Sequence, residues 1–181
     1  MRRVKIQSLR HVSLVGAVVV LLAAGSAAAE GKGSVQVLRF DGIGPLHLGM
    51  TRAEAVATGW LAKPTTGCEL AGTPLPVVYR LTGPKAPAGI NGTVEFDHGT
   101  LRVFAFSAGV KTTFGVAIPG GTVTDLVSRA RAAGLSATSV YDKVFAGRFV
   151  TVKRGGKQVL GAFAEKSTIS TIAVPYVPVC E

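Results

Sequence analysis

Residues 44–51 read Gly-Pro-Leu-His-Leu-Gly-Met-Thr, and residues 115–122 read Gly-Val-Ala-Ile-Pro-Gly-Gly-Thr. The two stretches share two glycines and a final threonine at a constant spacing of 71 residues (115 against 44). A match repeated at a fixed offset indicates an internal duplication, although a match this short also arises by chance. The duplication hypothesis predicts the same local structure in both halves of the chain.

Each stretch ends where a helix is expected to begin. Thr51 is followed three residues later by Glu54, which is the pattern of a capping box, and the helix is expected to run to about Thr58. The apolar stripe expected to face the core is Ala53, Val56 and Trp60.

The second helix is expected to open at Thr122, with Asp125 at its third helical position and Gly134 past its end. Its apolar stripe has helical spacing and consists of Val123, Leu126, Val127 and Ala130.

Most of the remaining chain reads as strands that are joined by short turns. Residues 61–76 contain too many prolines and glycines for a regular element and are expected to form a loop. The expected strands are 35–40, 77–81, 93–97, 101–107, 137–141, 148–153, 158–164 and 168–174, with a strand-like tail at 177–180.

These elements predict an α+β fold in which short helices pack on an antiparallel sheet, as a tandem duplication of a helix-plus-sheet unit. A single domain is expected at 35–181, with 35–110 and 111–181 as hypothetical repeats. About 150 residues are enough to bury a core without metal ions or a dense disulfide framework. The length therefore argues against a multidomain enzyme.

The first 29 residues have the features of a secretory signal peptide. Residues 1–11 hold four basic residues and no acid, residues 12–24 are almost all apolar, and 27–29 are three alanines. An uncleaved membrane anchor is the alternative, because the uncharged segment is just long enough. Cleavage would lower the net charge from +10 to +6 by removing four bases, and would leave 30–34 as a flexible leader.

The exported chain is therefore expected to be secreted or held in the cell envelope, and to have no membrane span after cleavage. Export argues against nucleic acid as a partner of the excess positive charge, which leaves an anionic cell-wall polymer, lipid head groups or an acidic protein surface. Several bases gather in the second half, namely Lys143, Arg148, Lys153, Arg154, Lys157 and Lys166. A solvated strand face is the alternative explanation for them.

The chain has two cysteines, Cys68 and Cys180. In an oxidising compartment beyond the membrane, two thiols usually form a disulfide, so we expect them to be joined. A catalytic cysteine paired with His47 or His98 is the alternative, but neither cysteine has an activating motif around it.

The sequence offers little for catalysis. The glycine spacing before Thr51 and Thr122 matches a phosphate-binding loop, but the required lysine is replaced by Met50 and Gly121. The one cluster of acids with a histidine is Glu95, Asp97 and His98, which suits either a cation site or a solvated strand face. No cofactor or metal is therefore expected.

By elimination, the sequence favours a non-enzymatic binding module that recognises another protein through a sheet face or loops. The alternatives are an envelope-associated structural protein held by charge on anionic cell-wall polymer, and a small secreted hydrolase. Aromatic residues and arginines most often anchor protein interfaces. The candidate partner-binding residues on expected strands are Tyr79, Arg80, Arg102, Phe104, Tyr141 and Arg148. A structural role is the alternative for Tyr79 and Phe104.

Residues 48–59 read Leu-Gly-Met-Thr-Arg-Ala-Glu-Ala-Val-Ala-Thr-Gly and are followed nine residues later by Cys68. This stretch resembles the repeat signature of the secreted beta-lactamase inhibitor protein family, and its Gly-Met-Thr helix start is similar to that of small outer-membrane assembly lipoproteins. The resemblance implies tandem modules of helices and antiparallel sheet whose concave sheet grips another protein. The second copy, at 120–122, has neither the methionine nor a following cysteine.

Overall fold

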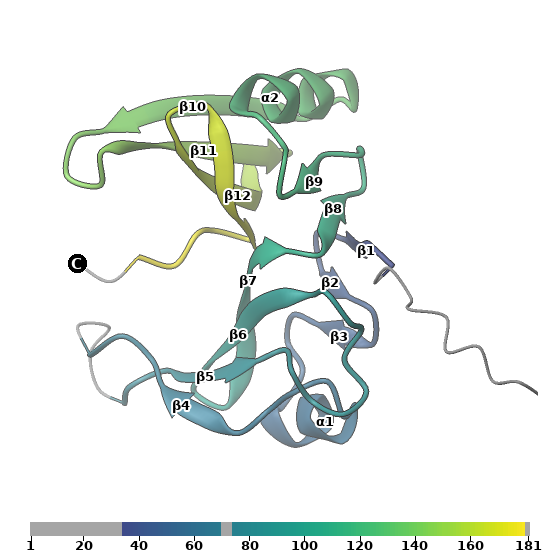
Figure 1. The fold of residues 1–181 in the computed structure, drawn as a ribbon. Coiled ribbons are helices and arrows are strands. Elements are labelled where there is room, and N and C mark those ends of the chain that lie inside the picture. The colour runs from purple at the N-terminus through teal and green to yellow at the C-terminus, as the bar shows by residue number, and fades with distance from the viewer. Residues whose placement is uncertain (1–33, 70–73, 180–181) are drawn as a thin grey trace, which may run out of the picture. The chain divides into compact units, whose positions relative to one another are not determined.

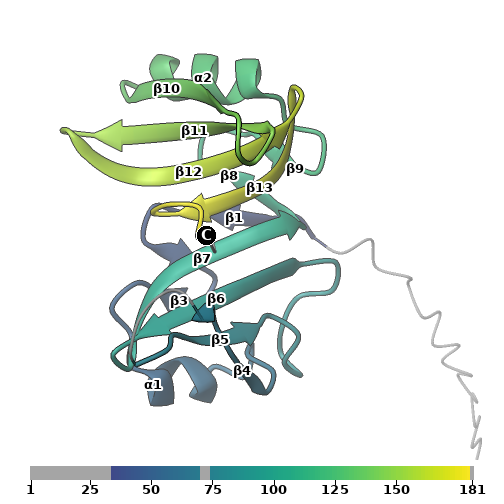
Figure 2. The ribbon, with the colours of Figure 1, turned by 90° about the vertical axis from the view of Figure 1, so that its left-hand side faces the viewer.

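The dominant element of the protein is one long antiparallel sheet (Figures 1 and 2). The computed structural model describes residues 34–69 and 74–179, so the predicted signal peptide and all but the last residue of the predicted leader lie outside it. The eight strands of this large sheet are β4 (Pro64–Thr66), β5 (Val77–Arg80), β6 (Asn91–Asp97), β7 (Thr100–Ala108), β10 (Ser136–Asp142), β11 (Gly147–Arg154), β12 (Lys157–Glu165) and β13 (Thr168–Val174). Their order across the sheet is β10-β11-β12-β13-β7-β6-β5-β4.

A second, smaller sheet lies behind the large one (Figure 2). Its strands are β1 (Gln36–Leu38), β2 (Gly42–Ile43), β3 (Leu46–His47), β8 (Val110–Thr112) and β9 (Ala117–Ile118), in the order β3-β2-β1-β8-β9. The first and second halves of the chain meet in this sheet too, because β1 pairs in parallel with β8.

The expected α+β fold is wrong, because the described chain is predominantly β. It contains two helices, α1 (Arg52–Ala57) and α2 (Val123–Ala132), which have only six and ten residues. Nearly half of the described residues belong to strands, far more than belong to helices, and these strands are paired in two sheets. The helices cover parts of one sheet face and do not form a layer of their own (Figure 1).

The same order of elements occurs twice, as a helix followed by four antiparallel strands. In both halves the start of the helix is joined to the turn before the last strand. The amide of Arg52 donates to the carbonyl of Gly99 at 3.1 Å, and the amide of Val123 donates to the carbonyl of Ser167 at 3.0 Å. Each helix is therefore held at its first residue by the final hairpin of its own half.

Both helices begin as the sequence predicts. The Glu54 amide donates to Thr51 Oγ1 at 3.3 Å, and the Thr51 amide donates to Glu54 Oε2 at 2.8 Å, which completes the capping box. At α2, the Asp125 amide donates to Thr122 Oγ1 at 3.1 Å. Leu126 and Ala130 of α2 are fully buried, in agreement with the expected stripe.

The stripe predicted for α1 is wrong. Ala53 is exposed and Val56 is 45% exposed, whereas Ala55 is the residue of this helix that is completely buried. A helix of six residues is held by its two ends, so a single small side chain is enough for contact with the sheet. Trp60, which lies beyond the helix, is buried as expected and covers Gly44.

Two other local predictions need correction. Residues 61–76 contain a short strand, β4, because Pro64–Thr66 pairs with Val77–Tyr79 of β5 in the register Pro64 with Tyr79. The described part of the tail, 177–179, is not a strand, although β-propensity favours one there. The proline at 178 cannot donate a backbone hydrogen bond, which weakens any pairing of this segment.

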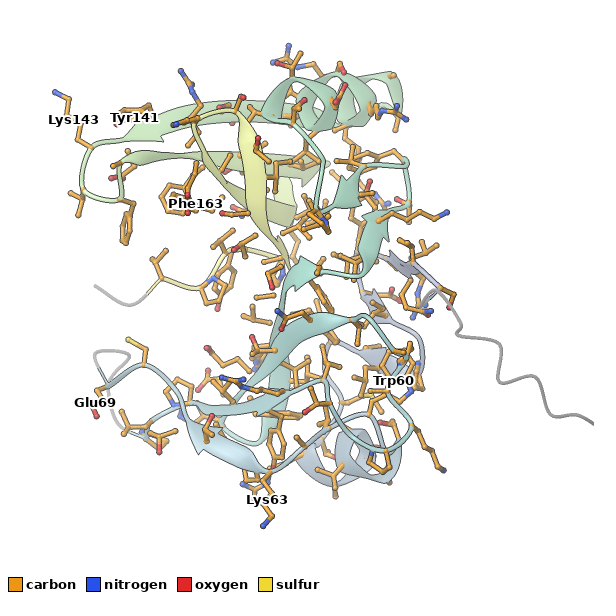
Figure 3. The ribbon with its side chains drawn as sticks, viewed as in Figure 1. Trp60, Lys63, Glu69, Tyr141, Lys143 and Phe163 are labelled. Atoms are coloured by element: carbon orange, nitrogen blue, oxygen red, sulfur yellow. The ribbon has the colours of Figure 1, made fainter. Side chains whose placement is uncertain are left out.

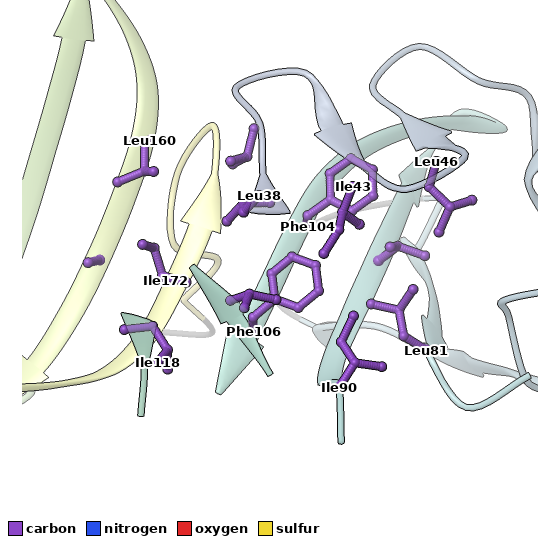
Figure 4. Packing of buried hydrophobic residues seen from close by; sticks show 14 of the residues in the cluster. Leu38, Ile43, Leu46, Leu81, Ile90, Phe104, Phe106, Ile118, Leu160 and Ile172 are labelled. Atoms are coloured by element: carbon purple, nitrogen blue, oxygen red, sulfur yellow. The ribbon is translucent and has the colours of Figure 1, made fainter. Parts of the chain in front are cut away.

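The hydrophobic core lies between the large sheet and the elements behind it (Figure 4). Phe104 and Phe106 of β7 are almost completely buried, and their rings stack at 6.4 Å between centroids. They contact apolar side chains from both halves of the chain. The labelled core residues of Figure 4 are Leu38, Ile43, Leu46, Leu81, Ile90, Phe104, Phe106, Ile118, Leu160 and Ile172.

The two edges of the large sheet differ. The β4 edge is three residues long and begins with a proline, whereas the β10 edge is seven residues long. On β10, the guanidinium group of Arg131 from α2 donates to the Ala137 carbonyl through Nε at 3.2 Å and Nη2 at 2.8 Å. The longer edge is therefore partly occupied by a side chain of the protein itself.

We expect Phe104→Ala to lower the free energy of unfolding by about 3–5 kcal/mol, because it leaves a cavity where a fully buried ring stood. Chemical denaturation measures this change. The matched control is Val144→Ala at a side chain that is 85% exposed, which should change stability by less than about 0.5 kcal/mol. Similar losses in both variants would show that the assigned core is wrong.

The capping box predicts a pH dependence. Hydrogen bonds from the backbone and hydroxyl group of Thr51 hold the pKa of Glu54 below its ordinary value of 4.5. A carboxylate with a lowered pKa stabilises the folded state above its unfolded pKa, and this contribution is lost as the pH falls through the folded pKa. The stability difference between wild type and Glu54→Gln should therefore be present at neutral pH and shrink below about pH 4.5.

Denaturation at several pH values measures this difference. Arg52→Gln changes a charge on the same helix without removing a capping group, and it should leave the pH dependence unaltered. A Glu54→Gln variant that follows the wild-type curve throughout would contradict the role given to the box.

Candidate functional site on the concave face of the large sheet

The large sheet curves around the chain that follows β13 (Figures 1 and 2). Successive side chains of a strand point to opposite faces of a sheet. On β11, Val150 and Val152 are buried toward α2, whereas Phe149 points the other way and pairs with Phe163 of β12. We call the side that carries Phe149 and Phe163 the concave face, and the side covered by the helices the convex face.

Three aromatic rings lie in a row on the concave face. Phe145, in the turn between β10 and β11, contacts Phe149 edge to face with 5.6 Å between ring centroids. Phe149 in turn contacts Phe163 at 5.0 Å. None of the three is fully buried, and Figure 3 shows Phe163 on the side of the sheet toward the C-terminal segment. This Phe cluster is separate from the core behind the sheet.

Residues 175–179, here called the C-terminal segment, cross the concave face beside this cluster (Figure 2). A side chain at Gly161 of β12 would come within 2.9 Å of the Val177 amide nitrogen and 3.1 Å of Tyr176 Cα. Only glycine leaves room for the segment to lie this close to the strand. Similarly, a side chain at Gly147 would meet the Phe163 ring at 2.3 Å. Gly161 and Gly147 therefore leave the space that the C-terminal segment and the Phe163 ring occupy.

Two adjoining cavities open on the concave face. One of about 300 Å³ is lined by Phe145, Phe149, Phe163 and the C-terminal segment, and it also reaches Ala105 and Thr171. Its neighbour of about 340 Å³ shares Ala105 and Thr171 and extends to Arg80 on β5. Ala105 is on β7 and Thr171 on β13, so the hollow spans the junction between the two halves.

Three charged side chains, Glu95, Asp97 and Arg102, act on the hydroxyl group of Tyr176 in the C-terminal segment. Burial, followed by the charge of Asp97, raises the pKa of Glu95 above its ordinary value of 4.5. Burial also raises the pKa of Tyr176, together with the negative charges of Glu95 and Asp97, while Arg102 acts in the opposite direction. Asp97, Arg102 and Tyr176 line a further cavity of about 540 Å³. This third cavity shares no lining residue with the other two, and Phe40 and Leu48 from outside the large sheet also line it.

The candidate residues from the sequence do not form one surface. Tyr79 and Phe104 are 5% and 0% exposed and belong to the core, which is the structural alternative left open for them. Arg80 and Arg102 are exposed. Arg80 lines the hollow on the concave face, whereas Arg102 lines the separate cavity with Asp97 and Tyr176. Arg102 stands at a β-bulge, because Glu95 pairs with Val103 and Phe96 with Leu101.

Tyr141 and Arg148 belong to the convex face. They are paired in register between β10 and β11, and Arg148 lines a cavity together with Val127 and Arg131 of α2. Tyr141 is 52% exposed, near the end of the hairpin shown in Figure 3. A partner bound to the concave face would therefore not reach these two side chains.

Sequence reasoning missed the Phe cluster. A signal for it exists, because Phe149 alternates with Val150 and Val152 along β11, so both faces of that strand carry large apolar side chains. Such a pattern is typical of a strand that is covered on both sides. The sequence does not reveal that a short tail would cover only part of the second face.

Of the predicted cluster of Glu95, Asp97 and His98, only Asp97 and His98 are in contact. Asp97 Oδ1 and His98 Nδ1 lie 2.6 Å apart at an exposed turn, while Glu95 is half-buried on β6. Across the described ranges, 34–69 and 74–179, no group of three metal-ligating side chains is brought together.

The expected disulfide stays a prediction, because Cys180 lies outside the described residues. Cys68 follows β4, at the end of the large sheet from which the 67–76 connection departs. No free cysteine occurs in the part of the chain that the structure describes.

Comparison with models of known protein families, with characterised proteins and with solved structures finds no match. Among the helices of the described chain, neither has the length and apolar character needed to cross a membrane.

The charged side chains around Tyr176 predict how its pKa responds to substitutions. Its pKa should lie above the ordinary value of 10, and it should fall in Glu95→Gln, because a neighbouring negative charge is removed. It should rise further in Arg102→Gln. NMR titration of the Tyr176 ring in wild type and in both variants measures these shifts. Shifts in the opposite directions would contradict the assigned neighbourhood.

Proposed function

We propose that the protein is an exported, non-enzymatic binding module that grips another protein with the concave face of its large sheet. The observation that carries the proposal is the Phe cluster, Phe145, Phe149 and Phe163, which lies outside the core beside an open hollow. Aromatic rings that are only partly covered are typical anchors of protein interfaces, where they are buried on binding.

The surroundings of the cluster support an interface. The hollow continues across the junction of the two halves to Arg80. Arg102 lines a separate cavity together with Tyr176 of the C-terminal segment. Arginine is the charged residue most enriched at interface anchors. Two exposed apolar side chains, Val140 and Val144, extend the surface along the hairpin between β10 and β11. An apolar centre with polar groups around it is the usual arrangement of a recognition surface.

The resemblance of residues 48–59 to the repeat signature of the secreted beta-lactamase inhibitor proteins points the same way, since that family is expected to bind through a concave sheet. We therefore include a secreted beta-lactamase among the partners to be tested. The basic N-terminal residues, the apolar run and the three alanines at 27–29 support export, and intact-mass analysis of protein from the medium would test cleavage.

Retention on an anionic cell-wall polymer is the second candidate function. The observation that favours it is the positive net charge, which is +10 for the full chain and would be +6 after cleavage of residues 1–29. Salt separates the two functions, because at about 1 M salt the screening length falls to roughly 3 Å, so purely electrostatic retention should be lost. Binding through the Phe cluster should persist.

The test of the main proposal compares the two faces of the sheet. Immobilised wild-type protein is used to capture partners from envelope and culture medium, and separately a purified beta-lactamase. We expect Phe145→Ala and Arg80→Ala each to weaken capture by roughly 30-fold, about 2 kcal/mol, with the melting temperature almost unchanged.

Arg148→Ala is the matched control, because it removes the same type of side chain as Arg80→Ala from the convex face. It should bind the partner as well as wild type does. Equal weakening by both arginine variants would indicate nonspecific charge, and normal binding by both concave-face variants would overturn the proposal.

A further inference from the structure

A second hollow lies on the convex face, between α2 and strands β10 and β11. Its volume is about 550 Å³, and three cationic side chains line it, Arg131 of α2, Arg148 of β11 and Lys166 of the β12–β13 turn. Hydroxyl groups of Ser128, Ser139 and Ser167 share the lining. No acidic side chain is among the lining residues. We call this hollow the α2 groove.

The three cations have no carboxylate partner. Within the described ranges, the ion pairs are Arg39 with Asp41 and Asp97 with His98, and neither involves the groove. Arg131 donates to the carbonyl of Ala137, which fixes its guanidinium group but does not neutralise it. The Arg148 guanidinium lies 3.5 Å from Ser139 Oγ. The groove therefore concentrates uncompensated positive charge.

Three acids lie nearest to the groove residues in the sequence, Asp125, Asp142 and Glu165, and none of them lines the groove. Asp125 of α2 accepts a hydrogen bond from the Thr122 hydroxyl at 2.9 Å as part of the helix cap. Asp142, at the end of β10, accepts from the amides of Val144 at 2.8 Å and Phe145 at 3.2 Å. Within the described residues, none of these three carboxylates forms an ion pair with a cation of the groove.

The lining is not a general result of the repeated fold. At the constant spacing of 71 residues, the helix positions of Thr124, Ser128 and Arg131 are held by Ala53, Ala57 and Trp60 in the first half. The first half therefore has no hydroxyl group or cation at the positions equivalent to Thr124, Ser128 and Arg131, although Arg52 stands at the position of Val123. The charged groove is specific to the second half of the chain.

We propose that the α2 groove binds a phosphate group that is carried by a small polyol or sugar. Guanidinium groups match phosphate oxygens with paired donors, lysine adds a point charge, and hydroxyl groups can donate to the remaining oxygens. The volume is in the range of pockets for small organic ligands and exceeds what a bare phosphate ion fills. Val123 and Val127 of α2 provide apolar contact for the carbon skeleton.

Titration calorimetry of the full chain with glycerol 3-phosphate tests the proposal, with inorganic phosphate and uncharged glycerol as comparisons. We expect saturable binding of glycerol 3-phosphate at one site, weaker binding of phosphate and none of glycerol. Arg148→Gln and Lys166→Asn should each weaken binding by about 10-fold or more, since each removes a charge-assisted contact. Asparagine is chosen because Lys166 has a left-handed backbone, with φ of 57°.

Lys143→Gln is the control, because it removes a charge from the same hairpin outside the groove. It should bind glycerol 3-phosphate normally, and thermal melting should show that all three variants are folded. Equal losses in Lys143→Gln, or no saturable binding by wild type, would overturn the proposal.

Two further probes identify the source of the phosphate. Retention on soluble poly(glycerol phosphate) that depends on Arg148 would assign the site to a polymer of phosphodiesters. Binding only to vesicles that contain phosphatidylglycerol, with no response to glycerol 3-phosphate, would make a membrane surface the partner and overturn the proposal. Because the groove and the Phe cluster lie on opposite faces, the loss of one activity leaves the other intact.

Discussion

The pairing of β13 with β7 is the contact on which the rest of the molecule depends. These are the last strands of the two halves, and their register places Ile172 opposite Phe106 and Val174 opposite Phe104. The junction turns two four-stranded sheets into one and puts the largest core side chains directly behind it. It also makes the two joined strands central, so their hydrogen-bonding groups are used on both sides. A continuous curved surface results, wider than either half provides.

The hollow on the concave face is a product of this junction. Ala105 and Thr171 stand on the two joined strands, and their small side chains leave open the space between the Phe cluster and Arg80. The C-terminal segment begins directly after β13, so the same strand that closes the sheet delivers Tyr176 and Val177 onto its face. Recognition residues from both halves are thereby presented together, although they are distant in the chain.

Much of this fold is visible in the sequence, because local rules govern it. The threonine caps at 51 and 122 and the alternation along β10–β13 predict the elements near their observed bounds. Strands of two or three residues, such as β2 and β4, were missed, since their pairing is set by distant partners and not by their own composition. The bulge at Arg102 and the six-residue length of α1 change which side chains are buried. Neither feature can be recognised from the spacing of apolar residues in the sequence. The class of fold was misjudged because the two helices are clear in the sequence but small in the structure.

The long edge of the large sheet has a consequence for how the molecule behaves in solution. An exposed strand of seven residues without proline or lysine is a template on which another chain can add, and β10 is such a strand. Arg131 opposes such addition, because its guanidinium group already donates to the Ala137 carbonyl of this strand and would meet its counterpart if two such edges approached. Like charges in this position oppose sheet extension most strongly at low ionic strength. We therefore expect the occupied Ala137 carbonyl and the charge of Arg131 to disfavour the addition of further strands at this edge.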